Sequence, residues 1–285
     1  MNRQSLKAIK PIYASYSALR YVAFQRHLAL ARLRDWRDGL DSSTVVAPPA
    51  RLRYRVHGKL DRESFLRTGE ILAQDIRDLC ALEGRDIFSH QRILDFGCGS
   101  GRVIRNFQDA PPSCELYGTD IDAELVTWCR EHLQGIRWST NGFQPPLPYH
   151  SDTFDLIYAV SVFTHLNEEF QRAWLAELRR VAKPGATVIL TVHGEYVIGT
   201  LPAVYQNRVH SDGFMFLTGA TGRLKLDGLP DFYQTAYHTQ EYIEREWSAY
   251  FEVVRYVERG INNHQDAVIL RARRVDVQGN QPRVG

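Results

Sequence analysis

The sequence predicts an α/β fold built on a mostly parallel sheet, and three observations lead to that prediction. From residue 91 onward, short apolar runs typical of buried strands alternate with amphipathic helical stretches. A glycine-rich turn follows the first of these runs, in QRILDFGCGSGR at residues 91–102. Near the end of the chain, two strand-like runs lie close together, which indicates an antiparallel pair at one edge of the sheet. The connecting helices are expected to cross over in the right-handed sense.

The first 50 residues are set apart by their positive charge. Up to residue 38, basic side chains outnumber acidic ones, with Arg3, Lys7, Lys10, Arg20, Arg26, Arg32, Arg34 and Arg37 against Asp35 and Asp38. Apolar residues recur at helical spacing, at Ile12, Tyr16, Leu19 and Ala23. A linker is expected at DSSTVVAPPA, because its two prolines cannot continue a helix. Residues 1–50 are therefore expected to form a basic helical extension. It either lies on an anionic membrane or packs on the main domain or a partner subunit, and packing is favoured because charged helix faces are usually solvated.

Residues 51–90 are expected to form a lead-in segment with one amphipathic helix. Between Arg62 and Gly84, apolar residues recur at helical spacing, at Phe65, Leu72, Ile76 and Leu79. Gly84 is expected to end this helix, since glycine readily adopts the left-handed conformation of a helix C-terminal cap.

The next hundred residues supply the regular alternation. Buried strands are predicted at RILDF, ELYGT, IRWS, FDLIYAV and ATVILTV. Helices are predicted at Arg102–Gln108, at AELVTWCREHL and at EEFQRAWLAELRRVA. The last of these is expected to be capped by Asn167 and closed by Pro184 and Gly185.

Between residues 194 and 248 the regular alternation of predicted strands and helices stops. The stretch is rich in aromatic residues and glycine, and it is too long for a plain connection between two elements. Long insertions near strand ends often form lids or substrate walls, so we expect a substrate-side insertion, with a decorative subdomain as the alternative. The final strands are predicted at YFEVVRYVE and DAVILRARR. The main domain is thus expected to span residues 91–275, followed by a tail at 276–285.

Composition narrows the class of protein. The 285 residues are 44% hydrophobic and 24% charged, the ordinary balance of a protein with a core. A formal net charge of +2 makes no strong demand for nucleic acid. The four cysteines show no metal-ligand spacing, so we expect reduced thiols and no metal site. No run approaches the roughly 18 apolar residues that a membrane span needs, and no secretory leader is evident, so a cytoplasmic location is expected.

The glycine-rich turn points to a particular kind of ligand. A dinucleotide-binding turn has the spacing GxGxxG, whereas here the order is Asp-x-Gly-x-Gly-x-Gly, from Asp95 to Gly101. An acid directly before the glycines suits a cationic amine better than a diphosphate. Asp120, in YGTDID, follows the second strand, where an acid accepts hydrogen bonds from a ribose diol. Together the two acids favour a ligand with a ribose and a cationic amino-acid end.

These motifs resemble those of the class I S-adenosylmethionine-dependent methyltransferases. The resemblance is carried by ILDFGCGSG, YGTDID, LPYHSDTFDLIYAVSVFTHL and ELRRVAKPGATVILTV, in that order along the chain. It implies a Rossmann-like, seven-stranded, mostly parallel sheet with an antiparallel last strand and helices on both faces. It also implies S-adenosylmethionine as cofactor, S-adenosylhomocysteine as product and a transferase activity of the EC 2.1.1 class. A dehydrogenase is the less favoured interpretation.

The resemblance also implies a set of cofactor-binding residues. Three glycines would bring the backbone close to the methionine and ribose of the cofactor, while acids would bind its amine and its ribose hydroxyls. Ile121 would lie against the adenine, and the carbonyl of Asn141 would accept from the adenine amine. Val160 and Ser161 would line the methyl-donor end. The full expected set is Asp95, Gly97, Gly99, Gly101, Asp120, Ile121, Asn141, Gly142, Phe143, Val160 and Ser161.

Methyl transfer to a hydroxyl needs a base, and four histidines are placed to serve the acceptor side. His193 closes the fifth strand and is the first choice for the base, and His264 is the second. Asp266, two residues after His264, is a candidate to orient it. The other two histidines and two aromatic residues are expected to bind the acceptor: His165, Tyr233, Tyr237 and His238.

Motifs that are absent from the sequence exclude some classes of methyl acceptor. The chain lacks the (Asp/Asn)-Pro-Pro-(Tyr/Phe) pattern of base amine methylation, a Pro-Cys dipeptide, and an acidic cluster at the end of the fourth strand that would indicate a divalent metal. The segments RLRYRVHGKLDRESFL, DFYQTAYHTQEYIEREW and GINNHQDAVIL are similar to bacterial methyltransferases of glycans and secondary metabolites. We therefore expect O-methylation of a small molecule or a sugar-containing acceptor. Methylation of a carboxylate or an amine, a non-catalytic binding module, and RNA methylation aided by the basic N-terminal half remain as alternatives.

Overall fold

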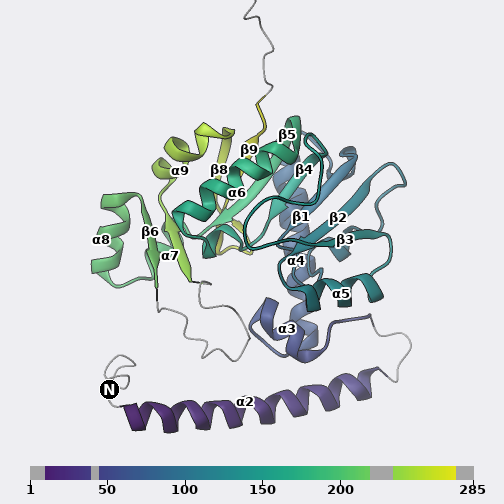
Figure 1. Cartoon of the computed structure of the whole chain (residues 1–285), viewed down its shortest axis with the longest axis vertical. Helices are drawn as coiled ribbons and strands as arrows, with labels where there is room; N and C mark the ends of the chain where they lie inside the picture. The colour runs from purple at the N-terminus through teal and green to yellow at the C-terminus, as the bar shows by residue number, and fades with distance from the viewer. Residues whose placement is uncertain (1–9, 40–44, 219–233, 274–285) are drawn as a thin grey trace, which may run out of the picture.

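The computed structural model describes residues 10–39, 45–218 and 234–273, and its centre is one seven-stranded sheet (Figure 1). The strands are β1 (Arg92–Phe96), β2 (Glu115–Asp120), β3 (Ile136–Thr140), β4 (Phe154–Ala159), β5 (Ala182–Val192), β8 (Glu252–Ile261) and β9 (Gln265–Arg271). Their order across the sheet is β3-β2-β1-β4-β5-β9-β8. The first five are parallel, and β9 runs antiparallel to both of its neighbours. The expected Rossmann-like sheet with an antiparallel last strand is confirmed.

Helices cover both faces of this sheet. The helices that pack on it are α4 (Arg62–Leu82), α5 (Ala123–His132), α6 (Glu168–Val181) and α9 (Gln240–Glu246). The described ranges also contain α2 (Lys10–Asp38), α3 (Ala50–His57), α7 (Glu195–Ile198) and α8 (Ala203–Asp212). Short 3-10 helices occur at Ile87–Ser89, Ile104–Phe107, Phe163–His165 and Trp247–Ala249. None of the helices in the described ranges is long and apolar enough to cross a membrane.

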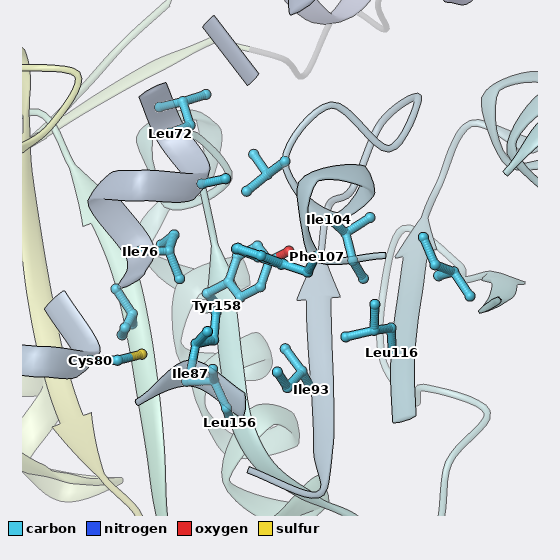
Figure 2. Close-up of a cluster of buried hydrophobic side chains, with 14 of the residues drawn as sticks. Leu72, Ile76, Cys80, Ile87, Ile93, Ile104, Phe107, Leu116, Leu156 and Tyr158 are labelled. Carbon is cyan, nitrogen blue, oxygen red and sulfur yellow. The ribbon is translucent and has the colours of Figure 1, made fainter. Parts of the chain in front are cut away.

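Two hydrophobic clusters, one on each face, follow from the alternation of side chains along the strands. In β1, Ile93 packs with α4 and α5, whereas Leu94 packs with α6 and α9. Figure 2 shows the first cluster, in which Tyr158 and Phe107 pack edge to face with ring centroids 6.1 Å apart. Because successive strand residues are all buried, the parallel strands read as continuous apolar runs in the sequence.

The helix boundaries follow from side-chain caps. Asn167 accepts from the backbone N–H of Phe170 at the start of α6, as expected, and Asp61 caps α4 in the same way. Gly84, just beyond α4, has φ +69°, which fits its expected role in ending that helix.

Two local predictions were wrong in detail. The helix expected at Arg102–Gln108 is only the 3-10 turn Ile104–Phe107, which directly follows the glycine turn. Helix α6 ends at Val181, before the expected stop signals, and β5 begins at once with Ala182. Pro184 and Gly185 therefore lie within the strand, where β5 pairs irregularly with β4.

The N-terminal helices stand outside the sheet, with α3 between α2 and the rest of the molecule (Figure 1). Arg53 of α3 is the main connection, with its side chain 2% exposed. Its guanidinium donates to Asp35 of α2 at 2.8 Å and to the backbone carbonyls of Pro48 and Leu60. The expected N-terminal helix is thus present and packs on the main domain through α3.

Most of the described part of the insertion at residues 194–248 forms a small unit beside the carboxyl edge of β5. Strands β6 (Phe214–Leu217) and β7 (Thr235–His238) pair antiparallel, and they pack with α7 and α8 around a minor core of Val197, Ile198, Val209, Met215 and Tyr237. The backbone N–H of His238 donates to the carbonyl of His193, which joins the unit to the end of β5.

Candidate active site

A cavity of about 570 Å³ opens at the carboxyl ends of β1, β2 and β4, where ligands bind in open parallel sheets. Ten of the residues predicted from the sequence line it: Asp95, Gly97, Gly99, Asp120, Ile121, Asn141, Phe143, Val160, Ser161 and His165. The remaining lining comes from Arg55, Val56, Phe96, Cys98, Arg102, Val103, Asp122, Ala123, Glu124, Leu125, Val162, Leu166 and Trp174.

The glycine turn forms one wall of the cavity. Gly97 and Gly99 have φ values of +77° and +55°, a left-handed conformation that side-chain-bearing residues rarely adopt. The turn is held in place because Gly97 N–H and Cys98 N–H both donate to the carbonyl of Thr119. A Cβ on Gly97 would collide with Val162, and one on Gly99 would come within 2.8 Å of Val56. Only a bare backbone fits here.

Gly101 lies outside the lining, although it belongs to the same motif. Its φ is +69°, and an added Cβ would meet Leu133 at 2.7 Å and Trp138 at 3.0 Å. Its role is therefore to let the turn pack against α5 and β3.

Asp95 is the buried charge of the site, with 2% of its surface exposed. Burial raises the pKa of its carboxyl to about 7; the Tyr158 hydroxyl opposes this shift, the Asp120 carboxylate adds to it and the Arg102 guanidinium lowers it. Its Oδ2 atom has no hydrogen-bond partner among the described residues. A buried, unsatisfied carboxylate oxygen beside a cavity is suited to a cationic or hydrogen-bond-donating ligand.

Asp120 fixes the opposite edge of the turn. Its Oδ2 accepts from Gly99 N–H at 2.7 Å, and its Oδ1 accepts from Asp122 N–H at 2.9 Å. Burial raises the pKa of Asp120, and the two backbone donors oppose that shift. Each oxygen keeps a second lone pair, so both can still accept from ligand hydroxyls.

Helix α3 forms a wall of the cavity, a role that was not predicted from the sequence. Arg55 donates to Asp122 at 2.9 Å and lies 2.8 Å from Glu124, at the start of α5. The Arg51 side chain also pairs with Glu124. Val56 contacts the glycine turn, so α3 closes over the cavity from the N-terminal side.

Two apolar side chains line the part of the cavity beyond Asp120. Ile121 is 40% exposed within it, and Phe143 packs on Phe170 with ring centroids 4.3 Å apart. Asn141 is buried, with its Oδ1 accepting from Thr119 and its Nδ2 donating to the carbonyl of Gly142. Gly142 itself does not line the cavity.

Ser161 has a strained backbone at the end of β4, with φ +62°. Its N–H donates to Thr191 Oγ1 at 2.8 Å, and Thr191 in turn donates to Gln265 Oε1 at 2.8 Å. Gln265 Nε2 donates back to Ser161 Oγ at 2.8 Å. This closed network ties the ends of β4, β5 and β9 together, and backbone strain of this kind is common at functional sites.

Four ring side chains, here called the row of rings, lie next to one another, starting at the cavity: His165, His193, His264 and Tyr237. His165 lines the cavity, and the His193 ring lies 6.4 Å from it, centroid to centroid. His264 lies a further 6.4 Å from His193, and Tyr237 lies 5.6 Å from His193. Neither His193, His264 nor Tyr237 contributes to the cavity lining itself.

His193 is neutral in this environment. Burial, followed by the neighbouring His165, lowers the pKa of its imidazole to about 4, against the opposing effect of the bond to the backbone of Ala236. Its Nδ1 is 3.2 Å from the carbonyl of Ala236, which can only accept, so Nδ1 carries the proton. Nε2 is therefore the basic nitrogen.

Three expectations for the acceptor side need correction or lie outside the described residues. His238 is completely buried and its Nε2 bonds to the amide of Gln171, so it is a core residue and does not face the cavity. Asp266 does not orient His264, because its two oxygens accept from the Tyr256 hydroxyl and from Arg259 N–H. Tyr233 lies outside the described residues.

Some residues that line the cavity were not predicted, although the sequence motifs pointed to them. Cys98, Asp122 and Val162 stand inside or directly after the motifs that identified their neighbours. For Arg55 and Val56 the only signal was the likeness of RLRYRVHG to other methyltransferases, which says nothing about position in space. Within the described ranges, no group of three or more His, Cys, Asp or Glu side chains could hold a metal ion.

Comparison with known proteins bears on this site. Residues 93–185 match the family described as "Methyltransferase domain". A tRNA (carboxymethyluridine(34)-5-O)-methyltransferase of Arabidopsis thaliana is 35% identical over 101 residues, which make up 35% of this chain and 23% of that protein. A malonyl-[acyl-carrier protein] O-methyltransferase of Hahella chejuensis is 27% identical over 101 residues, 35% of each chain. The matched stretch thus spans well under half the length of these relatives.

Solved structures with a similar fold include 1,6-didemethyltoxoflavin-N1-methyltransferase of Burkholderia thailandensis. It is 14% identical, with 82% of this chain and 94% of that chain covered at a TM-score of 0.52, and its structure holds 1,6-didemethyltoxoflavin and S-adenosylhomocysteine. A protein of Pyrococcus horikoshii OT3 is 15% identical, covering 76% of this chain and 97% of its own, with a TM-score of 0.54. At these identities the likeness concerns the fold.

Proposed function

We propose that the chain is an S-adenosylmethionine-dependent methyltransferase that methylates an oxygen atom of a small molecule or a sugar-containing acceptor. The match of residues 93–185 to the family described as "Methyltransferase domain" and the seven-stranded sheet support this proposal. The cofactor end of the site supports the binding of S-adenosylmethionine, and the acceptor end supports the choice of acceptor and base. Asp95 is the observation that carries it: a buried carboxylate oxygen without a partner borders the cavity, where the cofactor would bring a cationic amine.

The residues around the cavity fit S-adenosylmethionine. Asp95 would hold its amino group, and Asp120 would accept from its ribose hydroxyls through the lone pairs that the backbone leaves unused. Gly97 and Gly99 would allow the close backbone approach that their left-handed conformation already provides. Ile121 and Phe143 would flank the adenine.

Asn141 is a less complete match to the adenine amine. Its carbonyl oxygen already accepts from Thr119, and only the second lone pair of that oxygen would serve the ligand. We propose that Val160 and the strained Ser161 border the methyl-donor end, because both line the cavity where β4 ends.

The bound cofactor supplies a methyl group on a sulfonium, which is already activated for in-line displacement by a nucleophile. The chain then has to orient the acceptor, exclude water and take up the proton of a hydroxyl. We propose that His193 takes up this proton at Nε2, since its ring is neutral and follows directly behind the cavity-lining His165. His264 is exposed and is one ring farther away, so it is the weaker candidate.

We propose that His165 and Tyr237, both members of the row of rings, bind the acceptor. Aromatic and imidazole faces with few charges suit a ring-shaped organic molecule or a sugar better than a polyanion. The relatives act on varied acceptors according to their names, including a tRNA and an acyl-carrier protein. The acceptor class of this chain is therefore the part of the proposal that needs direct measurement.

The experiment is a transfer assay with S-adenosylmethionine carrying a radioactive methyl group, incubated with fractionated extract and then treated with mild base. Base-stable label in a small-molecule or glycan fraction is the expected result. Base-labile, volatile label would instead identify a methyl ester and replace the hydroxyl acceptor by a carboxylate. Label confined to RNA would contradict the small-molecule assignment.

Two controls separate the cofactor from the acceptor. The Asp95→Asn variant should lose both S-adenosylhomocysteine binding and label transfer, measured by calorimetry and by the assay. The His193→Ala variant should keep binding and lose transfer. If the unmodified chain fails to bind S-adenosylhomocysteine at all, the methyltransferase proposal itself fails.

A further inference from the structure

Helix α2 has two apolar sides, and only one of them is covered by the described parts of the chain. The covered side carries Phe24, Leu28 and Ala31 at helical spacing. Phe24 packs on Tyr54 of α3 with ring centroids 4.8 Å apart, and Leu28 is 3% exposed. This side accounts for the attachment of α2 to α3.

The opposite side is defined here as the outer face of α2 and consists of Leu19, Val22, Ala23, Arg26, Ala29, Leu30, Leu33, Arg34, Trp36 and Arg37, all of them exposed. Trp36 stands at the edge of this face, where it also lines a cleft with Asp35 and Arg53. The exposed fractions of Leu19, Val22, Leu33 and Trp36 are 71%, 65%, 60% and 65%. These residues recur three or four positions apart, so they form a continuous stripe along the helix. Figure 1 shows α2 at the periphery of the molecule, with α3 on its inner side.

The charges of α2 are divided between the two sides. Asp35 lies on the inner side, where it binds Arg53 at 2.8 Å. Asp38 is half-buried, with Arg37 3.5 Å away. Between residues 18 and 39, the outer face carries arginines but no acidic residue. It is thus both apolar and positively charged.

We propose that the outer face of α2 docks the protein onto the surface of an anionic phospholipid bilayer. A helix that combines leucine, valine and tryptophan with arginine binds in the plane of such a surface, where apolar side chains enter the interface and arginines meet lipid phosphates. The proposal concerns a different surface from the methyltransferase cavity and does not depend on the identity of the acceptor.

The combination of positive charge and apolar side chains disfavours two other binding partners of the outer face, a second copy of the chain and a nucleic acid. In a pair of two such helices, the Arg26 and Arg34 side chains of each copy would meet a surface that also carries only positive charge. A nucleic acid would satisfy the arginines but would leave the stripe of leucine and valine facing phosphates. An anionic bilayer satisfies both kinds of side chain at once.

The test uses the full chain and vesicles of phosphatidylcholine containing about 30% phosphatidylglycerol, with pure phosphatidylcholine vesicles for comparison. Binding is measured by flotation, and the fluorescence of Trp36 is measured in parallel, with Trp36→Phe to identify its share of the signal. We expect the chain to float with the anionic vesicles, to detach in high salt, and to show a blue shift that the Trp36→Phe variant lacks.

Matched variants assign the binding to the outer face. Leu19→Gln with Leu33→Gln should weaken it about tenfold or more, because two apolar side chains leave the interface. Tyr21→Gln is the control, since Tyr21 is 54% exposed but lies three positions before Phe24 and seven before Leu28, away from the outer face. Arg26→Gln with Arg34→Gln should weaken binding to anionic vesicles about tenfold and reduce its salt dependence, with the exposed Arg32→Gln as control.

Three results would overturn the proposal. One is the absence of flotation by a chain that still binds S-adenosylhomocysteine. Another is equal binding to both kinds of vesicle. The third is a lipid-free dimer in sedimentation equilibrium that the Leu19→Gln, Leu33→Gln variant dissociates, which would assign the outer face to a second copy of the chain.

Discussion

The backbone N–H of Gly99 donates to Oδ2 of Asp120 across 2.7 Å, so the glycine turn after β1 is locked to the end of β2. One carboxylate therefore shapes the cavity and also faces the ligand. Because the turn and the acid share a hydrogen bond, disturbing either should affect binding of the same molecule.

Replacing Gly99 by alanine should weaken S-adenosylhomocysteine binding by about 100-fold or more. The new Cβ meets a left-handed backbone and comes within 2.8 Å of Val56, so the turn or α3 has to move. Gly135→Ala is the matched control, because Gly135 has φ +77° and nothing within 4 Å of the added Cβ. The control should lose about 1 kcal/mol of stability but retain full affinity in calorimetry. Equal losses of affinity in both variants would contradict a specific role for the turn.

Asp95→Asn should stabilise the ligand-free chain at alkaline pH while weakening cofactor binding at least tenfold. The pKa of Asp95 is about 7 in the folded chain and about 4 when unfolded. Folding stability that depends on this group is therefore fully present below pH ~4 and is lost as the pH rises through ~7. Thermal unfolding at pH 5 and pH 8 checks the sign, and the difference in Tm between variant and wild type should increase at pH 8. A difference that shrinks as the pH rises would show that Asp95 is already paired in the ligand-free chain.

His193→Ala should lower kcat about 100-fold and leave S-adenosylhomocysteine affinity unchanged. Since the pKa of His193 is lowered to about 4, its ring stays neutral from pH 6 to pH 9, and kcat/KM should show no titration of His193 across that interval. His264→Ala is the control, and its exposed ring should cost little activity. A larger loss in His165→Ala than in His193→Ala would transfer the role of the base to the cavity-lining ring.

Arg55→Ala should weaken cofactor binding about tenfold through the α3 wall, without any direct contact to the reacting atoms. The side chain of Arg55 is 14% exposed and bonds Asp122 and Glu124, so its removal leaves Asp122 without its arginine and Glu124 with Arg51 alone at the cavity edge. Arg51→Ala provides the comparison, because the Arg51–Glu124 pair is exposed and exposed pairs contribute little. Calorimetric titration of both variants should give a clear difference; similar affinities would show that α3 is not held by Arg55.

The parts that could be predicted from the sequence are those with local causes. Asn167 caps α6 within three residues of its own position, and the continuous apolar runs follow from burial on both faces of a parallel sheet. Asp95 and Asp120 could be assigned to one ligand because each stands at the end of a predicted strand, where an acid suits a cationic amine or a ribose, and both line the cavity.

The parts that could not be predicted depend on contacts between distant residues. Arg55 and Asp122 are 67 positions apart, and no periodicity relates them. Asp266 was expected beside His264 because they are close in sequence, but alternation along β9 directs its carboxylate to Tyr256 and Arg259. His238 and Tyr237 are neighbours in β7 and both are buried, but on opposite faces of the strand: Tyr237 packs in the minor core of the insertion, whereas His238 bonds Gln171 of α6.

The position of α3 has a kinetic consequence. Val56 lies against the glycine turn, and the ion pairs of Arg51 and Arg55 hold the helix over the cavity mouth. A molecule that leaves past α3 needs these pairs to open, and salt weakens them more than it weakens the buried contacts inside. The residence time of the spent cofactor should therefore shorten as ionic strength rises, and the turnover rate would then be set by the helix that covers the site.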